Sequence, residues 1–394
     1  MIMKQTPSSN RPSMLLALDT TSGSILHKLF GYANRSTLGR TFPLSTIYIA
    51  SLALTFFPLL IAVLLGPLSL SEITPTHKLP FLYDWNVLFM FLISFPSLVI
   101  CIANDQNILL SSLMKVEADE SLVIDKENAS RVCILWKKRF RKINYFAYTL
   151  GLIAGATVVY FNYVAYTPAS VGYWIAQNGK LVPVGFVLLY CVFLFYCLVP
   201  LLIFRIVGVT LLLRDIVAFS RLCILPLHPD KSGGLRPMGN LGLRNQYLLT
   251  IFGLNIALMI AIPFRYLHAP ITLYTLTIFA VISYIIIGPI IFIAPLMPFR
   301  KGMLAMRDEL MKVVSRRMRI ELDRLNLQMN SEAINKEDAD SIEMLQKIAS
   351  VVDLLPTWPF DASIMRRFIV AFVIPLISSL IAKAISIFVI SHFK

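Results

Sequence analysis

The chain has 394 residues, of which 57% are hydrophobic and only 15% are charged, and its mean hydropathy is +0.72. A water-soluble protein of this length needs more charged residues to cover its surface, so the composition excludes a soluble enzyme and a disordered or fibrous chain. The net charge of +14 would suggest nucleic acid as the partner of a soluble protein. In a membrane protein it is typical of cytoplasmic segments beside anionic lipids, so we expect membrane lipids and no nucleic acid as partners.

Seven apolar segments are long enough to cross a hydrocarbon core of about 30 Å. They lie near residues 44–66, 84–104, 146–166, 184–212, 247–267, 271–298 and 367–391. Because lipid offers the backbone no hydrogen-bond partner, each span should be a helix, and the sequence predicts an all-α polytopic membrane helix bundle. We expect four parts: a basic cytosolic N-terminal segment (1–43), a transmembrane bundle (44–298), a cytosolic helical hairpin (299–366) and a last transmembrane helix (367–394).

The distribution of basic residues predicts the orientation of the bundle. Thirty of the 36 Lys and Arg residues fall in segment 1–43 and in the connections 105–145, 213–246 and 299–367. This asymmetry predicts that these four segments are cytoplasmic, with the N-terminus inside and the C-terminus outside. The first 40 residues contain no long apolar stretch, so we expect no cleavable signal peptide.

Few polar residues interrupt the spans. Arg205 and Lys383 are charged, and Asn162 and Asn255 carry amides. Charges inside a span are functional candidates, although long basic side chains near a span end also extend to the interface. No acidic residue is expected deep in a span, which disfavours a proton-coupled carrier. In the third span, the small residues at 147, 151 and 155 favour close helix packing, within the chain or between subunits.

The connection after the fourth span contains the most distinctive group of polar residues. The candidate ligand-binding residues are His228, Asp230, Lys231, Gly233, Gly234 and Arg236. Glycines let a turn present its N–H groups, and the two cations favour an anion such as a phosphate-bearing ligand or lipid headgroup. The alternative is a tight connector built on an Asp-based turn. The preceding segment, 214–227, is amphipathic and too short to span, so we expect it to lie along the inner interface.

Segment 299–366 shows two apolar stripes at helical spacing. The first contains Met303, Met306, Leu310, Val314, Met318, Leu322, Leu325 and Met329, and the second contains Ile342, Leu345, Ala349, Val352 and Leu355. Facing stripes of this kind predict an antiparallel helical hairpin, whose first helix continues the sixth span. Residues 303–355 would then either mediate a homo-oligomer or bind a protein partner, or pack on the chain itself, for example against 105–145.

The chain returns to the membrane through the segment Leu355–Asp361, whose aromatic residues favour the headgroup level. Asp361 is expected to cap a helix that begins at Ala362. With its HPDKSGGL and LPTWPFD segments, the chain over residues 184–391 resembles a group of uncharacterised bacterial multi-pass membrane proteins that pair an HPD-x-x-GGL loop with an LPTWPFD segment. The resemblance implies a location in the cell inner membrane and no established activity.

Motifs for catalysis and metal binding do not occur. No two of the five histidines form a His-x-x-x-His pair, no cysteine stands at ligand spacing, and there is no G-x-S-x-G. We therefore expect no enzyme, no metal, no cofactor and free cysteines. Two functions remain open: a sensing, signalling or defence-type component that acts through the cytosolic loop and hairpin, and a channel or transporter that favours anions at its cytoplasmic mouth. A polar path linking Arg205, Asn162 and Asn255 would favour the second.

Overall fold

The computed structural model describes residues 15, 17–27, 43–66, 80–166, 174–177, 180–226, 228–261, 271–329 and 336–392. Side chains are described for these residues except 165–166, 176–177, 261, 271–277, 327–329, 336–339 and 379–392. The described part of the chain is almost entirely helical, with two short antiparallel strand pairs.

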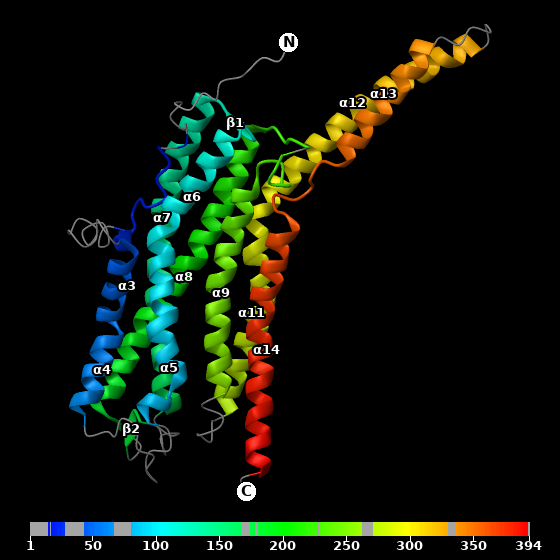
Figure 1. The fold of residues 1–394 in the computed structure, drawn as a ribbon. Helices are drawn as coiled ribbons and strands as arrows, with labels where there is room; N and C mark the ends of the chain where they lie inside the picture. Colours follow the sequence, from blue (N-terminus) through cyan, green and yellow to red (C-terminus); the bar gives the residue numbers. More distant parts are fainter. Residues whose placement is uncertain are drawn as a thin grey trace.

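The helices follow one another in the order in which the spans were predicted (Figure 1). In chain order they are α3 (Pro43–Leu54), α4 (Phe56–Leu65), η1 (Phe81–Tyr83), α5 (Trp85–Phe89), the π-helical η2 (Met90–Ser94), α6 (Phe95–Ala118), α7 (Lys126–Tyr166), α8 (Pro183–Ala218), α9 (Arg236–Ala261), α11 (Ile271–Ile293), η3 (Ala294–Leu296), α12 (Met297–Met329), α13 (Lys336–Asp353) and α14 (Ala362–His392). The strands are β1 (Leu122–Ile124), β2 (Ala176–Gln177), β3 (Lys180–Leu181) and β4 (Ser220–Leu222).

Six helical stretches within the described residues are long and apolar enough to cross a membrane. They are Pro43–Leu65, Trp85–Ala118, Lys126–Val164, Pro183–Ala218, Arg236–Ile260 and Ile278–Asn326. The 31-residue α14 runs beside α9 and α11 along the bundle (Figure 1). The prediction of an all-α polytopic membrane helix bundle is therefore confirmed.

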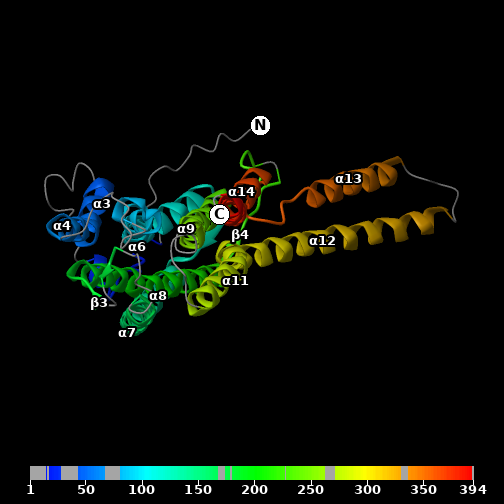
Figure 2. The ribbon, with the colours of Figure 1, turned by 90° about the horizontal axis from the view of Figure 1, so that it is seen from below.

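The helical hairpin between the last two long helices is also confirmed. Helix α11 passes through η3 directly into α12, and α13 packs against α12 on the way back. Figures 1 and 2 show this hairpin projecting away from the other helices. Only its base joins the buried core, through Met303, Val352 and Leu355. We call the end of the bundle from which it projects the hairpin end.

The helices at the hairpin end are longer than the apolar spans. Helix α6 continues to Ala118 and α7 begins at Lys126, so most of segment 105–145 is helix rather than loop. Segment 214–227, which we expected along the inner interface, begins with the last turn of α8 and continues into β4, which pairs with β1 in the register Leu122↔Leu222. Because β1 lies between α6 and α7, this pairing joins the two connections at the hairpin end.

Two features close the bundle. The described N-terminal residues 17–27 enter it, where the side chains of Leu18, Thr20 and Ser24 are buried. Helices α7 and α8 pack closely, since a Cβ atom added at Gly151 would lie 2.2 Å from the carbonyl oxygen of Cys197. The small residues of the third span therefore serve packing within the chain.

Candidate functional site

The loop before α9 is organised around the carboxylate of Asp230. This carboxylate accepts hydrogen bonds from the backbone N–H groups of Ser232 (2.9 Å), Gly234 (3.0 Å) and Arg236 (3.2 Å). Nδ1 of His228 lies 2.6 Å from its Oδ1. Partial burial raises the pKa of Asp230, but the hydrogen bonds from the backbone and from His228 lower it by more. The pKa of Asp230 therefore lies below its usual value of 3.8. The negative charge in this loop is thus that of the Asp230 carboxylate.

The glycine pair has a structural role in this loop. Gly233 and Gly234 have φ values of +65° and +88°, and a Cβ atom at Gly234 would lie 1.7 Å from Oγ of Ser121. The same Oγ donates to the carbonyl of Gly233 at 3.1 Å. Lys231 is exposed, also with a positive φ of 57°. An external anion would therefore meet the side chains of Lys231 and Arg236 here, because three backbone donors of the loop already serve Asp230.

The two segments that carry the family resemblance touch each other. A Cβ atom at Gly233 would lie 3.3 Å from Cγ of Pro356, and Nη2 of Arg236, the residue directly after the loop, lies 3.9 Å from Oδ2 of Asp361. Asp361 accepts a hydrogen bond from the N–H of Ile364 at 3.0 Å, which confirms the predicted cap of α14. These segments, far apart in the sequence, therefore form one packed unit at the base of the hairpin.

A second polar group lies inside the bundle, around Arg205 of α8. Its side chain is only 2% exposed, and its Nε and Nη2 donate to Oδ2 of Asp105 in α6 at 3.3 and 3.2 Å. Nη1 of Arg244, in α9, donates to the other oxygen of Asp105 at 3.2 Å. The expectation was that no acidic residue lies deep in a span, and Asp105 stands one residue beyond the predicted span 84–104, within the longer helical stretch Trp85–Ala118. Arg205, rather than extending to the interface, is buried in an ion-pair cluster.

The N-terminal segment covers this cluster. Oε1 of Gln106 accepts hydrogen bonds from the N–H groups of Thr20 (3.2 Å) and Thr21 (3.1 Å), and Nη2 of Arg205 donates to Oγ1 of Thr20 at 3.4 Å. Burial, with help from the charge of Arg205, lowers the pKa of His27 to about 4, against smaller opposite effects of Asp105 and Asp19. The imidazole is therefore neutral at pH 7, and the cluster holds two guanidinium groups against one carboxylate.

The other predicted intramembrane residues are not joined to this cluster. Nδ2 of Asn162 donates to the carbonyl of Val158 in its own helix at 2.7 Å, and Nδ2 of Asn255 donates to the carbonyl of Asn86 at 3.3 Å. Lys383 falls in α14, where its side chain lies outside the described residues. No interaction among the described side chains links Arg205 to either asparagine, so the polar path that would favour a channel is not seen in this part of the chain.

The structure also bears on metal binding. Within the described residues, no group of three or more His, Cys, Asp or Glu side chains could hold a metal ion, and the five cysteines are free. Sequence reasoning missed two members of the buried cluster, Asp105 and Arg244, because both fall in polar stretches that were assigned to connections.

Comparison with known proteins gives no match, either to a protein-family model, to a curated protein or to a solved structure. The similarity of the HPDKSGGL and LPTWPFD segments to a bacterial membrane family therefore stays a prediction. What the chain does has to be argued from its own geometry.

Proposed function

We propose that this protein is a non-enzymatic multi-pass protein of the bacterial inner membrane that serves in sensing, signalling or defence, and that it acts through its hairpin, which pairs with the hairpin of a second copy. The observation that carries the proposal is an apolar face along the hairpin that the rest of the described chain leaves exposed. The N-terminus is cytoplasmic and the C-terminus outside in this proposal, which rests on the distribution of basic residues.

The hairpin uses one apolar stripe of each helix for its own packing. The inward positions alternate at spacings of three and four residues, as in a coiled coil. They include Met311, Val314, Met318 and Leu325 of α12 and Ile342, Leu345, Ala349 and Val352 of α13, all buried or half-buried. The sequence placed Leu310 and Leu322 in this stripe, but both are exposed. These two predicted positions therefore face outward, although the other described members of the predicted stripe in α12 are buried or half-buried.

A second apolar stripe runs beside the first on both helices. Its members are between 37% and 64% exposed: Leu310, Val313 and Ile320 of α12, and Met344, Ile348 and Val351 of α13. In an antiparallel helix pair, positions on the same flank of the two inner stripes lie side by side, so these six residues form one face, which we call the outer face. The opposite flank is mostly polar, with Lys312, Ser315 and Arg319 against Glu343, Gln346 and Ser350, and Leu322 is an exposed apolar residue on it. Such one-sided apolar surfaces are typical of interaction sites.

The charges of the hairpin favour a second copy as the partner. Helix α12 carries eight basic and four acidic residues, whereas α13 carries two basic and five acidic residues. A two-fold arrangement that places α12 of each copy over α13 of the other brings opposite net charges together and buries both outer faces. The result is a four-helix bundle made of two hairpins.

The test is to introduce charge on the outer face and, as a control, on the opposite flank. In full-length protein reconstituted in nanodiscs large enough for two copies, we expect the wild type and Ser315→Glu/Gln346→Glu to hold two copies per disc by single-molecule photobleaching. We expect Val313→Glu/Ile348→Glu to hold one. A wild type that holds one copy per disc overturns the proposal, and so does a Val313→Glu/Ile348→Glu variant that still holds two. If a different protein binds this face, it should bind the wild type and Ser315→Glu/Gln346→Glu but not Val313→Glu/Ile348→Glu.

One observation favours the alternative of an anion-conducting channel or transporter: Nη1 of Arg205 is buried and has no hydrogen-bond partner. A buried guanidinium donor of this kind can bind a passing anion. Chloride and potassium flux into liposomes, measured for the wild type and for Arg205→Ala, tests this function. Chloride flux that the substitution changes would support conduction, and absence of flux in both would leave the hairpin as the working part.

A further inference from the structure

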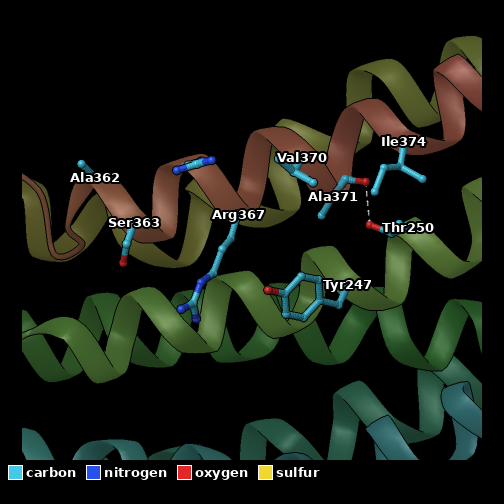
Figure 3. A pocket seen from close by; sticks show the side chains of 9 residues that line it. Tyr247, Thr250, Ala362, Ser363, Arg367, Val370, Ala371 and Ile374 are labelled. Carbon is cyan, nitrogen blue, oxygen red and sulfur yellow. Dashed lines mark hydrogen bonds between the residues drawn. The ribbon is translucent and has the colours of Figure 1, made fainter.

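A groove of about 660 Å³ lies between α9 and the first turns of α14, at the hairpin end. Its walls include Tyr247 and Thr250 of α9 and Arg366, Arg367, Val370 and Ile374 of α14. In Figure 3 the side chain of Arg367 extends from α14 toward α9, and the hydroxyl of Tyr247 points toward it. We infer that this groove binds an anionic phospholipid, with the phosphate on the two arginines and an acyl chain along the apolar wall.

The charge of the groove is not neutralised by the protein. Arg366 and Arg367 are exposed, and within the described part of the chain neither guanidinium takes part in a hydrogen bond or ion pair. The carboxylate of Asp361, a few residues earlier, is engaged by Ser363, the N–H of Ile364 and Arg236. The guanidinium groups of these two consecutive residues are therefore free to hold a phosphodiester, for which the paired N–H donors of each are well suited.

The position of the arginines matches the headgroup level. They stand four and five residues after the start of α14 at Ala362, which is about 6–8 Å along the helix axis. The segment that precedes α14 carries Trp358, a residue type that favours the membrane interface. The two cations thus lie where the phosphates of the nearer leaflet are expected.

The remaining wall of the groove suits an acyl chain. Val370 and Ile374 follow the arginines toward the middle of α14 and are 51% and 44% exposed. The floor is fixed, because Oγ1 of Thr250 donates to the carbonyl of Ala371 at 2.9 Å and ties α9 to α14 (Figure 3). A small anion would use only the arginines, whereas a phospholipid uses both the cationic end and this apolar wall. A zwitterionic lipid would place a second cation beside the arginines, so the groove should select lipids with net negative charge.

The test measures how tightly purified full-length protein retains phosphatidylglycerol, phosphatidylcholine and inorganic phosphate, by native mass spectrometry from detergent. Each basic residue near anionic lipid contributes about a fivefold gain in affinity, so Arg366→Ala/Arg367→Ala should bind phosphatidylglycerol about 25-fold more weakly. The matched control is Arg316→Ala/Arg317→Ala, an adjacent arginine pair on α12, which should bind as the wild type does. If the alanine pair inserts poorly, Arg366→Lys/Arg367→Lys keeps the charge and should show a smaller loss.

A variant of the apolar wall separates a lipid from a free anion. Ile374→Gln should weaken the retention of phosphatidylglycerol without changing the binding of inorganic phosphate. Equal retention of phosphatidylcholine and phosphatidylglycerol by the wild type would overturn the inference, as would full displacement of the lipid by inorganic phosphate. The inference does not depend on hairpin pairing, because Val313→Glu/Ile348→Glu leaves every residue of the groove in place.

Discussion

Replacing Asp105 by Ala tests whether the buried ion-pair cluster holds α6, α8 and α9 together. Asp105 joins the guanidinium of Arg205 in α8 to that of Arg244 in α9. Its loss leaves Arg205, which is 2% exposed, as an uncompensated buried charge. Arg244 is 19% exposed in its side chain and can turn toward water, so the two hydrogen bonds from Arg205 determine the cost.

The magnitude follows from those two hydrogen bonds. A hydrogen bond to a charged group contributes about 1.5–3 kcal/mol, so the two together give about 3–6 kcal/mol. Removing one partner of a buried ion pair costs about 3–5 kcal/mol in measured cases, which agrees. Replacing both partners by apolar residues of similar volume is often neutral. The double variant Asp105→Leu/Arg205→Met should therefore be much more stable than Asp105→Ala.

The stability can be followed with a maleimide dye that fluoresces when a buried thiol becomes accessible. Cys101, Cys133 and Cys191 are buried, whereas Cys197 and Cys223 are partly exposed and should be replaced by Ser beforehand. We expect Asp105→Ala to unfold at a clearly lower temperature than the wild type, with the double variant close to the wild type. If Asp105→Ala melts with the wild type, or if the double variant melts with Asp105→Ala, the cluster does not stabilise the bundle as argued.

Three further outcomes are expected at the hairpin end. Gly234→Ala should lower stability by about 2 kcal/mol or more, since φ is +88° and the new Cβ meets Ser121; Gly234→Ala/Ser121→Gly should recover part of the loss, and full recovery would mean that φ costs nothing. Asp230→Asn should lower the free energy of unfolding by about 1–2 kcal/mol at pH 7; because the pKa of Asp230 is lowered on folding, this difference should shrink as the pH falls below 3.8 and vanish below the folded pKa. Because the pKa of His27 falls from 6.5 to about 4 on folding, the stability of the packed segment 17–27 is full above pH 6.5 and should drop by about 2 kcal/mol at pH 5. The amide protection factors of that segment, which are corrected for the pH dependence of intrinsic exchange, should then fall in the wild type and change little in His27→Gln, and equal protection factors at pH 7 and pH 5 in the wild type would contradict the assignment.

The spans could be predicted because lipid requires long apolar helices, but the ends of the helices could not. Hydropathy registers only the part of a helix that faces lipid. Helix α6 extends beyond residue 104 and α7 begins well before residue 146, in stretches that are polar enough to resemble loops. At the hairpin end these stretches pack on one another and on β1 and β4, so helices continue there without an apolar window.

The buried cluster could not be predicted from local sequence. Asp105 stands just beyond a predicted span and Arg244 just before one, and both have the appearance of ordinary flanking charges. The N-terminal segment joins the cluster from far away in the sequence, since Thr20 is hydrogen-bonded to Gln106 and to Arg205. The loop at Asp230 was easier to predict, because an Asx turn beside a glycine pair is recognisable in the local sequence. The observed hydrogen bonds fit the tight connector that we gave as the alternative to an anion site.

The way the hairpin is attached indicates how an event on it can reach the membrane helices. It is attached to the bundle by two connections, and neither is a flexible linker. The first connection is η3, through which α11 continues into α12. The other is the segment from Leu355 to Asp361, where two prolines fix the backbone and where Leu355 and Phe360 are buried. The start of α12 also touches the second connection, since the guanidinium of Arg300 lies 4.1 Å from the ring centre of Trp358. We therefore expect a displacement of the hairpin to shift the start of α14, and with it the wall of the groove that α14 shares with α9.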